Sequence, residues 1–361
     1  MPKVAIIIIN WNGMKYLPDL FESLCKVNYP KESWQVFFVD NASSDKSVEW
    51  VRENYPYAFI IQNPLNFGFA KGNNIGMRAA LEQNFDYIYL LNQDTVVDPD
   101  FIREAVLVGE SDKSIGAIQS FIHLWPEKHL LNSSGNRLHF LGFSYCGNYR
   151  KNAKEVYDEL SEGGYKNFVI IPTASGAGVM LRSSVLKEVG LFDEDLYLYH
   201  EDVDLSLRIR LAGYRIVCAL KSVIYHKYEF SRSIQKYYWM ERNRLIVWFK
   251  NLSYPTLVLL LPALIFAELG LFIISFWNGW WREKLRVYSY FKYKNNWLNI
   301  FKKHSQVQAL RRVSDREIIN FFTDKIEFQE VTSWFTKKIA NPLCGVYFKI
   351  VILLIRPDKL G

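Results

Sequence analysis

Polar side chains of the kind that bind nucleotides and cations follow the apolar runs in the first half of the chain. Asp40 ends the run WQVFFVD, and its carboxylate can accept a hydrogen bond from a nucleobase N–H or a ribose hydroxyl. Asp94 follows the run YIYLL, where a carboxylate suits a hard divalent cation that also holds phosphate oxygens. Either aspartate could instead cap the following helix. The other polar residues at these run ends are Asn10, Asn12, Asn41, Asn92 and Gln93.

A glycine- and asparagine-rich segment, NPLNFGFAKGNN, begins at Asn63. Its glycines, including Gly68, let the backbone approach a ligand closely. Lys71 supplies a positive charge, and the helix expected to follow supplies N–H donors. Together with Asn66 and Asn74, these features predict a diphosphate site, although such loops are also common as simple turns.

Three carboxylates in four residues occur in the segment HEDVDLSLR, at Glu201, Asp202 and Asp204. One interpretation is a helix N-terminus, where acids complement the helix dipole and Asp204 pairs with Arg208 one turn later. The functional interpretation is that one carboxylate acts as a general base at the mouth of a pocket. His226 follows the apolar run VIYH and is either structural or a further metal ligand.

An alternation of strands and helices must position these residues. Strands are expected at 4–10, 34–39, 58–62 and 87–91, and later at 215–219 and 223–225. Helices are expected at 17–25, 44–54, 71–83, 99–108, 184–189 and 201–212. Near-continuous apolar strands between amphipathic helices predict an α/β fold with a mostly parallel sheet flanked by helices. In such sheets ligands bind beyond the carboxyl ends of the strands, where the polar residues lie.

Composition excludes several classes of protein. The 361 residues are 50% hydrophobic and 22% charged, which excludes a disordered or low-complexity chain. The four cysteines are far apart, which excludes a disulfide scaffold and a zinc ribbon. The net charge of +7 is uneven, because residues 227–312 contain 15 Lys and Arg against 4 Asp and Glu. Such a basic region suits nucleic acid or an anionic membrane surface.

An apolar segment inside this basic region favours the membrane. Residues 254–277 are long enough to span a bilayer and contain one charge, Glu268. Pro255 and Pro262 interrupt the segment, and basic residues flank both of its ends, unlike a simple span. We therefore expect a re-entrant or interfacial segment, with 343–355 as a second one, and no nucleic-acid partner. A buried helical hairpin in a soluble protein is the alternative. The N-terminus has no apolar run long enough for a signal peptide.

The order of these motifs is more specific than any one of them. A strand-end aspartate, a Gly/Asn loop, a third strand ending in Asn92-Gln93-Asp94, the segment Gly176-Ala-Gly and then HEDVDLSLR resemble glycosyltransferase family 2 over residues 3–250. The most similar branch contains rhamnosyltransferases and galactofuranosyltransferases. The resemblance implies a GT-A fold in residues 1–227 that binds a nucleotide-diphosphate sugar, followed by a basic, aromatic and apolar helical region in 228–361.

The resemblance also implies roles for individual residues. Asp40 would contact a uracil or thymine base, and Asn92-Gln93-Asp94 stands where the family has its Asp-x-Asp motif. Asp94 and His226 would hold a divalent Mg or Mn ion. Glu201-Asp202 matches the catalytic pair, with Asp202 as the base of an inverting transfer, while Asp204 and Arg208 remain structural. The implied donor-side residues are Asn10, Asn12, Asp40, Asn41, Asn66, Gly68, Lys71, Asn74, Asn92, Gln93 and Gly176.

The C-terminal region would then bring a polyprenyl-linked or other glycan acceptor to the cytoplasmic face of a membrane, for cell-surface polysaccharide assembly. Arg242 and Arg244 precede the apolar segment and could bind an acceptor diphosphate, or could simply anchor the chain by snorkelling. Two other functions remain open. A sugar nucleotidyltransferase shares the alternation but normally has a basic, glycine-rich loop after its first strand, where this chain has Asn-Trp-Asn-Gly. A sugar-binding or scaffold protein without catalysis is the second, and Asn92 favours it.

Overall fold

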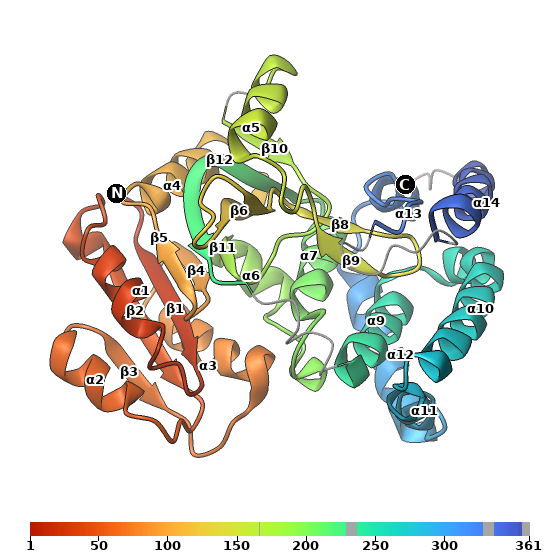
Figure 1. Cartoon of the computed structure of the whole chain (residues 1–361), viewed down its shortest axis with the longest axis horizontal. Coiled ribbons are helices and arrows are strands. Elements are labelled where there is room, and N and C mark those ends of the chain that lie inside the picture. Colours follow the sequence, from red (N-terminus) through yellow and green to blue (C-terminus); the bar gives the residue numbers. More distant parts are fainter. Residues whose placement is uncertain (166, 229–236, 328–335, 356–361) are drawn as a thin grey trace. The chain divides into compact units, whose positions relative to one another are not determined.

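The computed structural model describes residues 1–165, 167–228, 237–327 and 336–355. The chain forms two compact units (Figure 1). Unit 1 contains residues 1–136, 146–209 and 214–229, and unit 2 contains 137–145, 210–213 and the described part of 230–361. Two short segments from the first part of the chain thus belong to unit 2.

A mixed ten-stranded sheet forms the centre of unit 1 (Figure 1), with the main strand order β10-β12-β6-β11-β4-β1-β2-β3. The strands β4, β1, β2 and β3 run parallel to one another, as predicted. Strand β11 is antiparallel to both β4 and β6, so the rest of the sheet is mixed instead of mostly parallel. The strands of the main order are β1 (Val4–Asn10), β2 (Trp34–Asp40), β3 (Phe59–Gln62), β4 (Tyr87–Leu91), β6 (Ile115–Leu124), β10 (Phe168–Ile170), β11 (Gly178–Arg182) and β12 (Arg215–His226). Two short strands, β5 (Thr95–Val97) and β7 (Leu131–Ser133), pair with β12 and β6.

Helices cover this sheet because their apolar residues recur at helical spacing. In α1 (Leu17–Leu24), Leu17, Leu20, Phe21 and Leu24 are all buried in the same core as the central strands. Helix α3 (Gly68–Glu82) approaches β1 so closely at Gly72 and Gly76 that a β-carbon at either position would collide with an isoleucine of β1. The other helices of unit 1 are α2 (Ser47–Asn54), α4 (Phe101–Ser111), α5 (Ala153–Glu162), α6 (Ser183–Val189) and α7 (Glu201–Leu211), with short 3₁₀ turns at Lys31–Ser33 and Glu194–Leu196.

Strand β12 is one strand where the sequence predicted two. Its pairing with β6 shifts register between Ala219 and Val223, so the interruption at Lys221 and Ser222 is an irregularity within a continuous strand. The register then places His226, at the end of β12, opposite Thr95 at the start of β5. This pairing brings two segments that are far apart in the sequence to the same end of the sheet.

Unit 2 is helical. Its apolar core contains Phe140, Trp248, Leu260, Val287 and Phe348. Helix α9 packs against α11 and α12, and α10 packs against α11 and α14. These helices are α9 (Tyr237–Asn251), α10 (Tyr254–Trp277), α11 (Trp281–Tyr290), α12 (Lys294–Ala309), α13 (Asp315–Ile319) and α14 (Asn341–Leu354), with a π-helical turn at Thr336–Ala340. The strands β8 (Asn136–Leu138) and β9 (Ser144–Cys146) form a separate two-stranded sheet at the chain's passage between the units.

Helix α10 is the one described helix that is long and apolar enough to cross a membrane. Its most apolar 18-residue window has a mean hydropathy of 2.7, yet only 17% of that window is buried inside the structure. A core helix of a soluble protein would be mostly buried. Most of the apolar surface of α10 therefore faces outward, although Leu257, Leu260 and Leu264 are buried in the core of unit 2.

Candidate active site

The carboxyl ends of β1 and β2 meet, and their polar residues form one hydrogen-bonded group. Asn10 and Asp40 are register partners, and Asn10 Nδ2 donates to Asp40 Oδ1 at 2.8 Å. The second oxygen, Asp40 Oδ2, accepts from the backbone N–H of Ser43 at 3.0 Å. Asn12 has a left-handed backbone (φ 48°), and its Oδ1 accepts from the N–H of Ser44 at 2.8 Å. These contacts fix the orientation of the Asp40 carboxylate, which is almost fully buried.

The predicted diphosphate loop is held by amide side chains. Asn41 Nδ2 donates to the carbonyl of Gly68 at 3.0 Å, and Asn66 Oδ1 accepts from the N–H of Gly68 at 2.9 Å. The N–H of Ala70 donates to the carbonyl of Tyr197 at 3.1 Å. Two N–H groups at the start of α3 thus already have protein partners. The Lys71 ammonium lies 4.1 Å from the centre of the Phe67 ring.

Asn74 has a structural role in the fold. It is buried, and its Nδ2 donates to the carbonyl of Phe192 at 2.9 Å and to Glu194 Oε1 at 3.0 Å. Its Oδ1 accepts from the N–H of Phe192 at 3.0 Å. These bonds attach the loop that precedes α7 to helix α3.

Asp94 and His226 lie side by side, as a shared metal site requires. His226 Nε2 is 3.3 Å from Asp94 Oδ1, and His226 Nδ1 is 3.1 Å from Asn132 Oδ1. With the proton on Nδ1 donated to Asn132, the lone pair on Nε2 faces the same space as the Asp94 carboxylate. Asn132 is the central residue of the short strand β7, and no sequence pattern links it to His226.

These two side chains fit a divalent cation but do not enclose one. A carboxylate with an imidazole suits Mn²⁺ among the hard cations, and the Asn132 contact is the outer-shell support that such a histidine needs. Within the described residues, no group of three His, Cys, Asp or Glu side chains gathers as a metal site. The remaining ligands of an ion here would have to come from water and from a phosphate-bearing substrate.

Asn92 and Gln93 of the Asn92-Gln93-Asp94 motif form hydrogen bonds with backbone groups of neighbouring segments. The N–H of Asn92 donates to the carbonyl of Ala177 at 3.1 Å. Gln93 Oε1 accepts from the N–H of Trp11 at 3.1 Å, which holds the exposed turn after β1 against this motif. Gly13 in that turn has no room for a β-carbon, which would collide with the side chains of Gln93 and Asn10.

Asp202 is held by two backbone N–H groups. Oδ2 accepts from Gly176 at 3.1 Å, and Oδ1 accepts from Val203 at 2.8 Å. Burial raises the pKa of Asp202, and these two N–H groups partly offset the increase. The result is a fixed carboxylate whose affinity for a proton is higher than that of an exposed aspartate.

The segment Gly176-Ala177 connects the two parts of the site. Its Gly176 N–H binds the Asp202 carboxylate, and its Ala177 carbonyl binds the N–H of Asn92, at the start of the motif that contains Asp94. Consecutive α-carbons are only about 3.8 Å apart, so Asp202 and the end of β4 lie close together. Gly176, Asp94, His226 and Asp202 therefore belong to one end of the unit 1 sheet.

Glu201 lies in a less favourable environment than its neighbour. It is buried, and its Oε2 atom has no hydrogen-bond partner among the described residues. Burial, followed by the charge of Asp202, raises the pKa of Glu201 well above its ordinary value. The preceding residues Tyr197, Tyr199 and His200 have positive φ angles of 61° to 69°. Such backbone strain is typical of functional sites.

We expect Glu201→Gln to stabilise the free protein at high pH. A carboxyl whose pKa is raised in the folded state contributes stability below its unfolded pKa, and that contribution is lost as the pH rises towards the folded pKa. Glutamine cannot ionise, so the variant avoids this loss. Melting temperatures measured from pH 4 to pH 8 should show a difference that grows in favour of the variant as the pH rises. A constant difference would mean that Glu201 is not forced towards its neutral form.

Asp204 and Arg208 are structural, in line with the sequence analysis. Arg208 Nε donates to Asp204 Oδ2 at 2.9 Å, and both side chains are buried. The same guanidinium donates to the carbonyls of Val189 and Leu191, both at 2.6 Å. The pair thus fastens α7 to the loop after α6.

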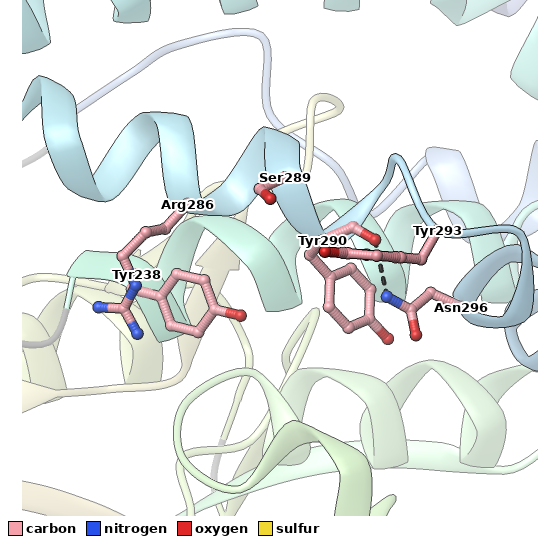
Figure 2. Close-up of a pocket in the computed structure, with 6 residues that line it drawn as sticks. All are labelled: Tyr238, Arg286, Ser289, Tyr290, Tyr293 and Asn296. Atoms are coloured by element: carbon pink, nitrogen blue, oxygen red, sulfur yellow. Dashed lines mark hydrogen bonds between the residues drawn. The ribbon is translucent and has the colours of Figure 1, made fainter.

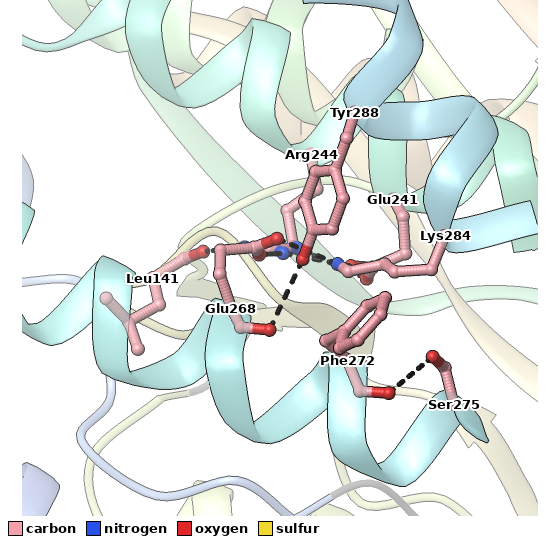
Figure 3. Close-up of polar contacts among 8 residues, drawn as sticks. All are labelled: Leu141, Glu241, Arg244, Glu268, Phe272, Ser275, Lys284 and Tyr288. Carbon is pink, nitrogen blue, oxygen red and sulfur yellow. Dashed lines mark hydrogen bonds and ion pairs between the residues drawn. The ribbon is translucent and has the colours of Figure 1, made fainter. Parts of the chain in front are cut away.

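Arg242 and Arg244 belong to unit 2, and both are buried. Arg244 pairs with Glu241 and Glu268 and donates to the carbonyl of Leu141 (Figure 3). Arg242 donates to Asn243 Oδ1 and stacks on Trp239, 4.5 Å from the ring centre. Binding of an acceptor diphosphate by these two arginines stays a prediction.

Comparisons with known proteins agree with this architecture. In sequence, the chain is 23% identical to the "Probable glycosyltransferase YdaM" of Bacillus subtilis, over 71% of this chain and 57% of that protein. It is 24% identical to the "Low-salt glycan biosynthesis hexosyltransferase Agl10" of Haloferax volcanii, over 57% of this chain and 61% of that protein. The chain thus spans about three fifths of the length of these two relatives.

In structure, the chain resembles the mannosyltransferase PcManGT of Pyrobaculum calidifontis, solved with GDP-Man and Mn²⁺. The TM-score is 0.51 at 16% identity, over 86% of each chain. GalNAc-T7, solved with UDP, GalNAc and Mn²⁺, gives a TM-score of 0.54 at 14% identity, over 68% of this chain and 47% of that one. At these identities the likeness concerns the fold, which is the GT-A-like α/β fold that the motifs predicted.

The sequence model described as "Glycosyltransferase like family 2" matches residues 2–246, which include every residue of the candidate site in unit 1. The chain therefore belongs to glycosyltransferase family 2, the family that this model describes.

Proposed function

We propose that the chain is an inverting, metal-dependent glycosyltransferase that moves a hexose from a nucleotide-diphosphate donor to a glycan acceptor. The observation that carries this proposal is the Asp202 carboxylate, fixed by two N–H groups at the same end of the unit 1 sheet as the Asp94–His226 pair. A single displacement at the anomeric carbon needs only a base on the acceptor side and a stabilised diphosphate leaving group. No covalent nucleophile is required.

Asp202 acts as the base in this proposal. Its carboxylate accepts the proton of the acceptor hydroxyl while the hydroxyl oxygen attacks C1 of the donor sugar and the bond from C1 to the diphosphate oxygen breaks. The raised pKa of Asp202 improves its affinity for that proton. Burial and the charge of Asp202 raise the pKa of Glu201 well above its ordinary value, which favours Asp202 over Glu201 as the base.

Asp94 and His226 would hold a Mn²⁺ or Mg²⁺ ion, which would supply positive charge to stabilise the diphosphate leaving group. PcManGT and GalNAc-T7 were both solved with Mn²⁺, which supports the use of a divalent metal. The rhamnose-like or galactofuranose-like donor, with UDP or dTDP, stays the preferred prediction. Asp40 would contact the base, and the loop of Asn66, Gly68 and Lys71 would face the diphosphate.

Removing the outer-shell partner of His226 should weaken metal binding. We expect Asn132→Leu to raise the Mn²⁺ concentration for half-maximal activity by about 10–100-fold, because His226 Nδ1 loses the acceptor that orients the ring. Asp94→Asn should raise it at least as much. The affinity for Mn²⁺, measured directly by electron paramagnetic resonance, should be highest in the wild type, lower in Asn132→Leu and at least as low in Asp94→Asn. The matched control, His129→Ala, removes an exposed histidine of unit 1 and should change neither value.

Unit 2 is proposed to attach the enzyme to the cytoplasmic face of a membrane and to present a lipid-linked acceptor. Exposed apolar residues repeat along α10 at Val258, Leu261, Ile265, Leu269 and Ile273, all at least 41% exposed. Helix α14 adds a second row of this kind, at Leu343, Val346, Ile350, Leu353 and Leu354. Soluble monomers rarely expose apolar patches of this extent. The basic composition of 227–312 suits anionic headgroups.

The position of Glu268 favours a helix that lies in the interface over one that crosses the bilayer. Glu268 occurs in the middle of α10 and pairs with Arg244 of α9 and Lys284 of α11 (Figure 3). A crossing helix would bring these charges into the hydrocarbon, at a cost of several kcal/mol. An interfacial α10 keeps them inside unit 2 and inserts only its outer face.

Placing a charge on this outer face should release the protein from vesicles. We expect Phe266→Glu to weaken binding to vesicles of phosphatidylcholine and phosphatidylglycerol by about tenfold or more, since inserting a phenylalanine contributes roughly 1.5–3 kcal/mol. Phe266 is 77% exposed, so the fold should not change. Leu107→Glu, at an exposed leucine of unit 1, is the control and should bind as the wild type does. Equal binding of all three proteins in a co-sedimentation assay would exclude the α10 face as the membrane contact.

A thermal-shift panel tests the donor directly. Purified chain should melt at a higher temperature with one class of dTDP-, UDP- or GDP-sugar in the presence of Mn²⁺ or Mg²⁺, because a ligand that binds only the folded state stabilises it. Asp94→Asn should reduce this shift. Equal melting temperatures with all donors, with and without metal, would contradict nucleotide-sugar binding.

A further inference from the structure

A pocket in unit 2 is not used by the chemistry proposed above. It has a volume of about 260 Å³ and lies between α9, α11 and the start of α12 (Figure 2). Its lining consists of Tyr238, Arg286, Ser289, Tyr290, Tyr293 and Asn296. The volume is just below the range of about 300–1,000 Å³ that is usual for drug-sized ligands, so the pocket suits one monosaccharide unit.

The lining combines aromatic faces with neutral hydrogen-bonding groups. Three of its six residues are tyrosines, and Ser289 and Asn296 add a hydroxyl and an amide. The amide is fixed, because Asn296 Nδ2 donates to the carbonyl of Tyr290 at 2.7 Å (Figure 2). A sugar presents C–H faces that pack on aromatic rings and hydroxyls that bond to such groups. The lining therefore suits a saccharide better than a purely apolar ligand.

Positive charge converges on one of these rings. The guanidinium carbon of Arg286 is 4.4 Å from the centre of the Tyr238 ring, and that of Arg242 is 5.5 Å from the same centre. Arg242 also lies 5.1 Å from the centre of the Tyr290 ring. Positive charge near these rings attracts an anion that binds at the pocket. The lining itself contains no acidic residue.

Arg286 can bind such an anion at little cost. Its side chain is 62% exposed and forms an ion pair with Glu283, three residues earlier on the same helix, at 2.6 Å. Exposed pairs of this kind contribute little to stability, so a phosphate can compete for the guanidinium. A guanidinium binds a phosphate through two parallel hydrogen bonds.

We propose that this pocket binds an anionic saccharide, a single sugar that carries a phosphate, with the sugar on the tyrosine rings and the phosphate at Arg286. Two sources share this chemistry: a free sugar phosphate and the headgroup of a lipid-linked sugar phosphate. If the ligand is the acceptor of the transfer reaction, that identification rests on the proposed transferase function. Binding itself requires no catalysis and no metal.

Titration calorimetry on the full chain tests the proposal, with metal chelated by EDTA so that the donor site does not contribute. One arm uses glucose 1-phosphate, with glucose as its uncharged control. The other uses phosphatidylcholine vesicles with polyprenyl-phosphate-glucose, and plain vesicles as control. Arg286→Gln should weaken binding of the preferred probe by about tenfold or more, the range for losing a charge-assisted hydrogen bond. Arg282→Gln, at another exposed arginine of α11, should not change it.

The outcomes separate this inference from the proposed function. Arg286-dependent binding of glucose 1-phosphate supports a site for free sugar phosphates, and Arg286-dependent binding of the lipid probe alone supports a headgroup site. Binding of neither probe, or equal binding by Arg286→Gln and wild type, overturns the inference. Asp202→Asn should bind the probe normally while losing transfer. An Asp202→Asn variant that binds the probe normally but keeps full transfer activity would therefore refute only the proposed base.

Discussion

Asp202→Asn should lower the turnover number by about 10²-fold or more, the general range for removing a catalytic base. The asparagine keeps the size of the side chain, and its Oδ1 can still accept from one of the two N–H groups, so the fold and the donor KM should stay close to those of the wild type. Steady-state release of nucleoside diphosphate at saturating donor and acceptor measures the effect. An unchanged donor KM separates a lost base from a disturbed donor site.

The pH profile provides a second readout of the same group. Because burial raises the pKa of Asp202, the acidic limb of kcat/KM should lie above the ordinary aspartate value of about 3.9. This limb should disappear in the variant. Asp158→Asn, at an exposed acid on α5, is the matched control and should keep both rate and profile. Full activity of Asp202→Asn would mean that another group takes the proton.

Arg244→Met should lower the free energy of unfolding of unit 2 by about 3–5 kcal/mol, as is typical when one partner of a buried ion pair is removed. Arg244 Nη2 is 3.0 Å from Glu241 Oε2 and also contacts Glu268, while Lys284 Nζ lies 2.5 Å from Glu241 and 2.9 Å from Glu268 (Figure 3). The substitution leaves the buried carboxylate of Glu241 and the partly buried carboxylate of Glu268 with one cation. Chemical denaturation followed by tryptophan fluorescence measures the loss.

Two controls test this interpretation. The double variant Glu241→Gln/Arg244→Met leaves the pair of Glu268 with Lys284 and should recover part of the lost stability. Lys26→Met breaks an exposed pair with Glu22 and should cost less than about 1 kcal/mol. Equal losses from the buried and the exposed variant would show that the cluster does not stabilise unit 2.

The pH dependence of this cluster has the opposite sign to that of Glu201. Burial opposes the charge of Glu241, but Arg244 and Lys284 outweigh it and lower the pKa of Glu241 to about 2. A lowered pKa contributes stability above the unfolded value of about 4.3, and this contribution is lost as the pH falls towards 2. The loss caused by Arg244→Met should therefore diminish in acid.

Strands with continuous apolar runs could be predicted from the sequence. The bounds of β1 and β4 agree with the prediction, because their side chains are apolar and are covered on both faces. Strand β6 was missed because Gln119 and Ser120 interrupt its apolar pattern. Both are buried, and Ser120 forms hydrogen bonds with Tyr89 and Ser222. The local sequence does not indicate that a polar residue is buried and forms hydrogen bonds with other strands.

The candidate site was predictable as a set of residue types but not as a geometry. Order along the chain suggested that Asp94, Asp202 and His226 act together, yet the proximity of Asp94 and His226 depends on the three-residue strand β5, which pairs Thr95 with His226. A strand that short carries no periodicity. Arg244 is a second example, because its partner Glu268 lies 24 residues further along the chain, and Lys284, which pairs with the same glutamate, lies 40 residues further. Nothing local distinguishes a buried cation from a ligand-binding one.

Nucleoside diphosphate release by the purified chain is the most direct test of the account. Wild type, Asp202→Asn and Asp158→Asn should be assayed side by side with dTDP-, UDP- and GDP-sugars, each with Mn²⁺ or Mg²⁺. The account predicts release from one class of donor by the wild type and the Asp158 variant, and almost none by the Asp202 variant. Release at the same rate by all three proteins, or from no donor at all, would contradict it.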